Sequence, residues 1–284
     1  MSIDPEAIPE LSIDASVRVG ERELRYDLSV SRGEHVTVIG PNGAGKSTLL
    51  LTLAGLQRVA DGAVHVRSLV VDEPATKTFI APHHRDVVLQ PQAGALFPHL
   101  TVLDNVAFAP RSQGASRRSA RADAAVILER VGIVDLAKRR PQELSGGQVG
   151  KVALARSLNS GSAVLLLDEP AAALDVEARA ELRHHLNDLD ATVVTVTHDP
   201  VEARLLGHRI VVVDHGRVLQ SGTAIQVAAS PRSRWVASLL GVNIVSGTAA
   251  GTTVMLDSTS LTLAEAAAGD VHVTFPANAV TLHR

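Results

Sequence analysis

Residues 35–56, HVTVIGPNGAGKSTLLLTLAGL, carry the strongest indication of the fold. Its first part, HVTVIG (35–40), is a short apolar run typical of a buried strand. GPNGAGKST (40–48) satisfies the phosphate-loop pattern G-x-x-x-x-G-K-[ST], and the residues from Lys46 onward predict a helix that stops near Asp61-Gly62. The pattern therefore stands after a strand and opens a helix, which argues against a glycine-rich turn that matches by coincidence.

This loop predicts a site for a polyphosphate. Successive backbone N–H groups point into such a loop, and the helix N-terminus adds positive potential. Lys46 is expected to reach the β- and γ-phosphates, and the Ser47 hydroxyl is expected to hold Mg²⁺. The expected phosphate-binding residues are Gly40, Pro41, Asn42, Gly43, Ala44, Gly45, Lys46, Ser47 and Thr48.

A phosphate loop also needs a carboxylate at the end of a second buried strand. LVVDEP (69–74) and VLLLDEP (164–170) both offer one. We choose the second, because LSGGQ (144–148) precedes it and a strand that ends in TVTHD (195–199) follows it; the first is expected to be a solvated turn. Asp168 is then predicted on the Mg²⁺ side, with Glu169 polarising the attacking water.

LSGGQ supplies a second candidate anion site. Ser145, Gly146 and Gly147 offer a hydroxyl and bare backbone amides at the start of a helix expected from about Gln148. Taken alone, the segment would be an ordinary Ser-Gly-Gly cap. The other motifs, in this order, favour the anion site.

Together these motifs resemble the nucleotide-binding subunit of an ATP-binding-cassette (ABC) transporter, over residues 11–230. The resemblance implies an α/β fold: a P-loop ABC ATPase domain with a mostly parallel sheet, an antiparallel β subdomain and a helical subdomain at about 96–150. Residues 235–284 are β-rich. They resemble the first half of a small oxyanion-associated (TOBE/Mop-like) domain, so a truncated C-terminal β domain is expected.

The resemblance also implies roles for individual residues. Two cassettes of this family pair head to tail, and Ser145, Gly146, Gly147 and Gln148 of one close over ATP held by the other. Asp175 matches the loop that communicates across the dimer. Glu169, His198 and Gln92 match the catalytic positions, although Gln90 is an alternative to Gln92. Ser47, Gln92 and Asp168 match the Mg²⁺ ligands, so ATP and Mg²⁺ are the expected cofactors.

Some positions depart from the family pattern. VGK (149–151) replaces the usual basic and glutamine residues after LSGGQ, and AAALD (171–175) lacks the usual serine. The aromatic residue that normally stacks on adenine has Val17 as its nearest match by spacing. Tyr26 is the only aromatic before the phosphate loop and is expected to pack in a strand. The expectation of ATP over GTP therefore rests mainly on the resemblance to the family.

Two segments indicate the cargo. QAGALFPHLTVLDNVAFAP (92–110) resembles importers rather than exporters. SPRSRWVASLLGVNIVSGT (230–248) and the closing VHVTFPANAV (271–280) are similar to the molybdate importer ATPases of actinobacteria, with sulfate, ferric iron and polyamine left open as cargo. The resemblance implies a second copy, two integral membrane permease subunits and an extracytoplasmic substrate-binding protein as partners. It places the chain at the cytoplasmic face of the cell membrane.

Composition argues against several kinds of partner and site. The 284 residues carry a net charge of −3 and no cysteine, which argues against nucleic acid as a partner and excludes a Cys-based site. The basic loop 112–121 has no interleaved aromatic residue, and the pairs His83-His84 and His184-His185 make poor shared metal ligands.

Two other classes of protein remain as alternatives. A DNA-repair or ribosomal cassette ATPase would carry a long coiled coil or two cassettes. A non-hydrolysing regulator would not need Glu169 and His198.

Overall fold

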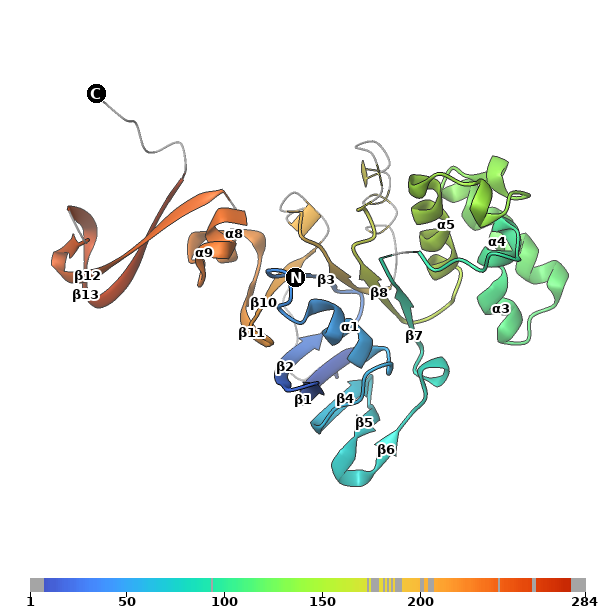
Figure 1. Ribbon diagram of the computed structural model, residues 1–284, viewed down its shortest axis with the longest axis horizontal. Coiled ribbons are helices and arrows are strands. Elements are labelled where there is room, and N and C mark those ends of the chain that lie inside the picture. Colours follow the sequence, from blue (N-terminus) through green and yellow to red (C-terminus); the bar gives the residue numbers. More distant parts are fainter. Residues whose placement is uncertain are drawn as a thin grey trace.

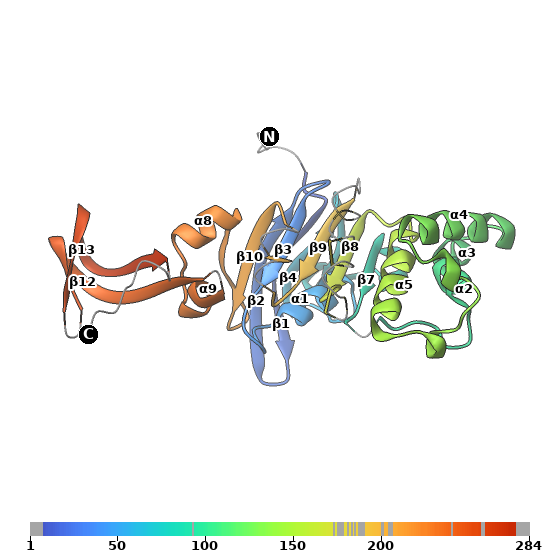
Figure 2. The same cartoon turned by 90° about the horizontal axis from the view of Figure 1, so that it is seen from above.

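The structure is a computed structural model that describes residues 8–276, apart from 93, 173, 175–178, 181, 183, 185, 187–190, 200–201, 204–206, 240 and 257–258. A mixed sheet forms the centre of the described part of the chain, a group of helices lies at one end, and a two-stranded ribbon lies at the other (Figures 1 and 2). The strand order in the central sheet is β6-β5-β4-β1-β2-β11-β10-β3-β9-β8-β7.

One half of this sheet is parallel. Its strands are near-continuous apolar runs, as expected for strands that are covered on both faces. They are β10 (Arg209–Asp214), β3 (His35–Ile39), β9 (Thr192–Val196), β8 (Val164–Asp168) and β7 (Val87–Gln90). Because these strands run the same way, their carboxyl ends share one edge. The phosphate loop follows β3 at that edge, Asp168 is the last residue of β8, and Glu169 comes directly after it.

The other half is antiparallel. It contains β1 (Leu11–Val19), β2 (Arg22–Val30), β4 (Asp61–Val66), β5 (Leu69–Glu73) and β6 (Thr78–Phe79). Strand β11 (Arg217–Gly222) pairs with β10 on one side and β2 on the other, and so joins the two halves. The alternation of apolar and polar residues in β2 matches its alternating burial.

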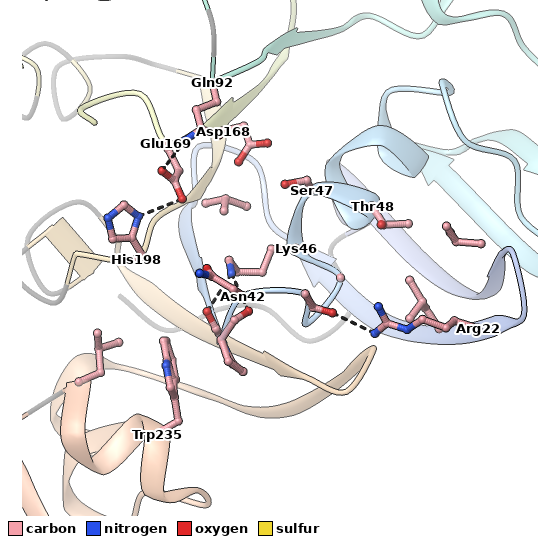
Figure 3. Close-up of a pocket in the computed structure, with 18 residues that line it drawn as sticks. Arg22, Asn42, Lys46, Ser47, Thr48, Gln92, Asp168, Glu169, His198 and Trp235 are labelled. Carbon is pink, nitrogen blue, oxygen red and sulfur yellow. Dashed lines mark hydrogen bonds and ion pairs between the residues drawn. The ribbon is translucent and has the colours of Figure 1, made fainter. Parts of the chain in front are cut away.

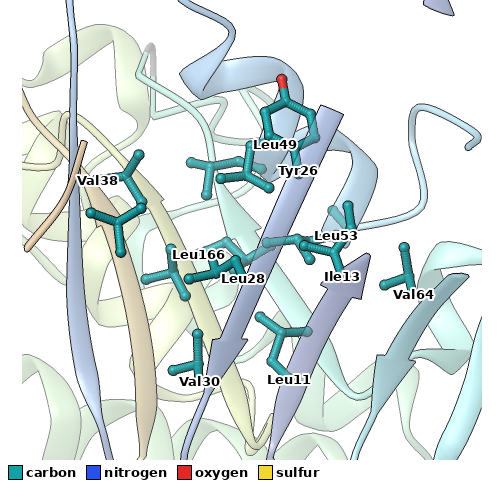
Figure 4. Close-up of a cluster of buried hydrophobic side chains, with 14 of the residues drawn as sticks. Leu11, Ile13, Tyr26, Leu28, Val30, Val38, Leu49, Leu53, Val64 and Leu166 are labelled. Carbon is teal, nitrogen blue, oxygen red and sulfur yellow. The ribbon is translucent and has the colours of Figure 1, made fainter. Parts of the chain in front are cut away.

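Helix α1 (Lys46–Leu53) is held in a core that the two halves of the sheet share. Leu49 and Leu53 from the helix pack in one cluster with Ile13, Leu28 and Leu166 from strands of both halves (Figure 4). The helix is shorter than the expected stop near Asp61-Gly62, which is instead the start of β4. It ends because Gly55 adopts a φ of 80°, a left-handed conformation that breaks the helical path.

A group of helices between residues 102 and 158 packs around a core of its own. Thr101, Ser116 and Ser145 cap three of the helices through their side-chain oxygens. The helices are α2 (Val102–Val106), α3 (Phe108–Ser112), α4 (Arg117–Arg130) and α5 (Gly146–Leu158). Short 3₁₀ turns lie at Pro74–Thr76, Pro82–His84, Val134–Leu136 and Pro141–Glu143.

The C-terminal part begins with two short helices, α8 (Ala224–Ala229) and α9 (Arg234–Leu239). They are followed by the antiparallel ribbon of β12 (Val242–Met255) and β13 (Ser260–Pro276). The ribbon forms a separate sheet that projects away from the central one (Figure 1). None of the described helices is long and apolar enough to cross a membrane.

The expectation for LVVDEP was wrong. Asp72 lies on β5 and is fully buried, not in a solvated turn. Its carboxylate accepts a hydrogen bond from the Val59 amide at 3.2 Å and pairs with Arg85 at 3.8 Å and Arg58 at 3.6 Å. The Asp-Glu-Pro sequence is the same in both segments, but these cations make the first one part of the core.

Candidate phosphate-binding site

A cavity of about 800 Å³ opens beside the phosphate loop. Its walls come from the loop and the start of α1, the ends of β8 and β9, the end of β1 with the first part of β2, and helix α9 (Figure 3). The lining residues that the sequence predicted are Gly40, Pro41, Asn42, Gly43, Gly45, Lys46, Ser47, Thr48, Gln92, Asp168, Glu169 and His198. Segments that lie far apart in the chain therefore meet at one cavity.

The phosphate loop is held in shape by glycines and by its own lysine. Gly43 and Gly45 have φ values of 76° and 105°, which residues with a Cβ rarely adopt. The Lys46 ammonium donates to the carbonyls of Gly40 at 2.8 Å and Pro41 at 3.0 Å. Burial lowers the pKa of Lys46, opposed by the nearby carboxylates. The ammonium thus lies within the curve of the loop.

Tyr26 supports the phosphate loop through a hydrogen bond from the buried side of the loop. Its hydroxyl donates to the Gly45 carbonyl at 2.7 Å, and a Cβ at Gly45 would lie 2.7 Å from that hydroxyl. Tyr26 is fully buried, and this burial raises the pKa of its phenol above its ordinary value. The ring packs in the sheet, as expected, and it is not a surface on which a base could stack.

Asp168 ends strand β8 beside the start of α1. Burial raises the pKa of its carboxyl, while a hydrogen bond with the Ser47 side chain acts in the opposite direction. Ser47 and Asp168 therefore place two oxygen donors together. Oxygen donors of this kind, with the amide of Gln92 in the same cavity, suit Mg²⁺, so the residues present fit a magnesium–phosphate group.

Glu169 is held between two side chains. One of its carboxylate oxygens accepts a hydrogen bond from Gln92 Nε2 at 3.0 Å, and the other lies 2.9 Å from His198 Nδ1 (Figure 3). Its backbone has a φ of 48°, and its amide donates to the Val196 carbonyl at 2.9 Å, so the strand end itself turns the carboxylate. Gln90 is buried on β7 and does not line the cavity, which favours Gln92 over that alternative.

The LSGGQ residues lie elsewhere. Ser145, Gly146, Gly147 and Gln148 begin α5, and none of them lines the cavity. Ser145 and Gln148 form a reciprocal cap: the Ser145 hydroxyl accepts from the Gln148 amide, and the Gln148 side chain accepts from the Ser145 amide. Asp175, the remaining predicted site residue, lies outside the described residues.

Sequence reasoning missed one end of the cavity. Val17 is fully buried, whereas Val19, Arg22 and Leu24 line the cavity. Val19 continues the face of Val17 two residues on, beyond the edge of the core, so 42% of it is exposed. Val17, the nearest match by spacing to the adenine-stacking position, therefore does not line the cavity, whereas its neighbour on the same face does.

Helix α9 supplies Trp235 and Leu239 to the same cavity, and no local motif signals this contribution. Among the described residues, no site built from three or more His, Cys, Asp or Glu side chains is present, and the Mg²⁺ set described above contains only one of these residues, Asp168.

The comparisons with known proteins agree with this geometry. Residues 25–172 match the family described as "ABC transporter". The molybdenum import ATP-binding protein ModC of Mycobacterium tuberculosis (strain ATCC 25618 / H37Rv) is 42% identical over 81% of this chain and 64% of its own length. The Fe(3+) ions import ATP-binding protein FbpC of Streptomyces avermitilis is 42% identical over 84% of this chain and 69% of its own length.

A solved structure is similar as well. The dimeric post-hydrolysis structure of the ATP-binding cassette MJ0796 bound to ADP and Pi has a TM-score of 0.65 and 28% identity, and covers 75% of this chain and 98% of that one. By contrast, the chain spans only about two thirds of the length of the first curated relatives that it matches.

Proposed function

This chain belongs to the ABC transporter family, and we propose that it is the ATP-hydrolysing subunit of a membrane importer. The observation that carries hydrolysis is the position of Glu169, held between Gln92 and His198 beside the phosphate loop. A protein that only bound nucleotide would not need a carboxylate oriented from both sides. This arrangement favours hydrolysis over the non-hydrolysing regulator.

Each residue has a separate part in the proposed reaction. The loop amides and Lys46 would bind the phosphates, and Ser47, Gln92 and Asp168 would hold Mg²⁺. When bound, Mg²⁺ neutralises charge that develops on the phosphates. Glu169 accepts a hydrogen bond from the attacking water and orients it, and His198 steadies Glu169 and the terminal phosphate.

A second copy completes the proposed site. Ser145, Gly146 and Gly147 start an exposed helix end outside this chain's own cavity, and such an end attracts anions. In a head-to-tail pair, the LSGGQ segment of one copy closes over ATP held by the phosphate loop of the other, and Asp175 belongs to the loop that communicates across the dimer. The dimeric MJ0796 structure supports this assembly.

We propose molybdate as the cargo. The similarity to ModC supports it, and the β-rich residues 242–276 are compatible with the proposed oxyanion-associated domain. The similarity to an Fe(3+) importer ATPase leaves ferric iron as an alternative cargo. Sulfate and polyamine also remain alternatives. The partners would be two permease subunits at the cytoplasmic face of the membrane and, through them, an extracytoplasmic binding protein.

Uptake by cells tests this function. Cells that depend on this chain receive either the native sequence or Lys46→Ala, and the uptake of molybdate and sulfate is measured in parallel. Lys138→Ala serves as the control because Lys138 is exposed and lies in the helical group, away from the cavity. We expect molybdate uptake to collapse with Lys46→Ala alone and sulfate uptake to be unchanged.

Two results would change this proposal. If sulfate uptake collapses and molybdate uptake does not, the chain powers an importer whose cargo is sulfate and not molybdate. If Lys46→Ala, present at native abundance, changes neither uptake, the chain powers neither process, and its role in molybdate import is rejected.

A further inference from the structure

We propose that Arg22 supplies the flat surface on which the nucleotide base stacks, in place of an aromatic ring. This inference rests on the proposed function, because it concerns the nucleotide held by the same cavity. It assigns a binding residue that no motif in the chain indicates. Arg22 begins strand β2 at the turn after β1, and its side chain lines the cavity.

The position of Glu169 and its two partners indicates which end of the cavity would receive the nucleotide base. Glu169, Gln92 and His198 gather on one side of the phosphate loop, and Arg22 lies on the opposite side (Figure 3). The terminal phosphate has to sit beside the carboxylates for hydrolysis to occur. The rest of a nucleotide therefore extends away from them, toward Arg22.

The guanidinium of Arg22 is held in place by the phosphate loop. Its Nη2 donates to the Gly43 carbonyl at 2.9 Å, while the residue as a whole is exposed. The apolar side chains of Val19 and Leu24 line the cavity beside it. A guanidinium is planar and weakly hydrated, and it stacks on bases and other π faces. The structure thus offers an anchored plane with an apolar border.

No aromatic side chain competes for this position among the described residues that line the cavity. Tyr26 is buried beneath the loop, and Trp235 comes from α9, on a different side of the loop from Arg22 (Figure 3). Stacking on a plane is tolerant of the base, because every base has a π face. The proposal therefore predicts that adenine and guanine nucleotides bind with similar affinity.

The test compares ligands with and without a base. Titration calorimetry measures binding of ADP, GDP and pyrophosphate, each with Mg²⁺, to the full chain and its variants. Arg22→Ala should weaken ADP and GDP binding by about three- to tenfold, the range expected from losing a cation–π contact. Pyrophosphate binding should stay within about twofold, since it has no base to stack.

Two variants separate stacking from charge. Arg22→Lys keeps the positive charge but loses the plane, so it should weaken ADP and GDP binding nearly as much as Arg22→Ala. Arg25→Ala is the matched control, because Arg25 lies on the same strand, is exposed, and pairs with Asp14 at 2.8 Å outside the cavity. Its affinities should equal those of the native chain.

Several outcomes would overturn the proposal. Equal loss of pyrophosphate and ADP binding in Arg22→Ala would make Arg22 a phosphate contact. Unchanged ADP binding in that variant would exclude any contact with the base. In both cases the proposed function stands, provided that Lys46→Ala abolishes binding. If the native chain binds none of the three ligands, the nucleotide site itself is rejected, and the role of Arg22 with it.

Discussion

At the scale of single residues, Arg85 shows how the antiparallel part of the sheet is tied to the helix that carries the phosphate loop. Its side chain is fully buried and donates to the carbonyls of Thr52 at 3.1 Å, Ile80 at 2.8 Å and Val71 at 3.3 Å. Burial lowers the pKa of Arg85, and Asp72 opposes this effect. The buried cation therefore holds the end of α1 against β5.

Removal of Asp72 should destabilise the protein strongly. Asp72→Ala leaves the Arg85 guanidinium buried without its counter-charge, and breaking a buried pair in this way costs about 3–5 kcal/mol. The free energy of unfolding from urea titration measures this loss. Asp61→Ala, an exposed position on the neighbouring strand β4, should change the same quantity by less than about 0.5 kcal/mol. Equal effects from the two variants would contradict this role for the pair.

At the scale of elements, the helical group is joined by an ion pair between α2 and α4. Arg121 donates to both carboxylate oxygens of Asp104, at 2.8 Å and 2.7 Å. These hydrogen bonds hold the pKa of Asp104 below its ordinary value, against the opposing effect of burial. The Thr101 hydroxyl adds a further hydrogen bond at 3.2 Å. This pair therefore joins α2 to α4.

The pair should make stability depend on pH. A carboxyl group whose pKa is lowered by folding stabilises the protein above its ordinary pKa, and this contribution is lost as the pH falls toward the folded value. Asp104→Asn should therefore lower the urea midpoint at pH 7, and the difference from the native chain should shrink as the pH is reduced below 4. A difference that stays constant from pH 7 to acid would show that the charge of Asp104 has no part in it.

The sequence predicts elements better than it predicts their tertiary neighbours. The phosphate loop and the Asp168-Glu169 pair could be found because strand, turn and helix follow one another in the chain. The positions of Val19 and Asp72 could not be predicted in this way. The exposure of Val19 depends on where the core ends, and the burial of Asp72 depends on a cation from another segment, Arg85. Arg22 and Trp235 reach the cavity only through the folded arrangement of a hairpin and a distant helix.

At the scale of the whole molecule, the two candidate phosphate-binding surfaces lie on different parts of the fold. The cavity lies at the carboxyl edge of the parallel strands, whereas the LSGGQ segment begins α5 in the helical group. Within one chain, the cavity and the LSGGQ segment therefore do not meet in the described structure. In the proposed head-to-tail pair, each cavity meets the LSGGQ segment of the other copy, so hydrolysis would require two copies.

The release of phosphate from MgATP by the purified chain shows whether Glu169 drives hydrolysis. We expect the native chain to hydrolyse ATP and Glu169→Gln to lose at least about a hundredfold in rate, the cost of removing one well-placed catalytic contact. Ser145→Arg should lose hydrolysis too while still binding nucleotide in its own cavity. Hydrolysis by Glu169→Gln at the native rate would contradict a catalytic role for Glu169.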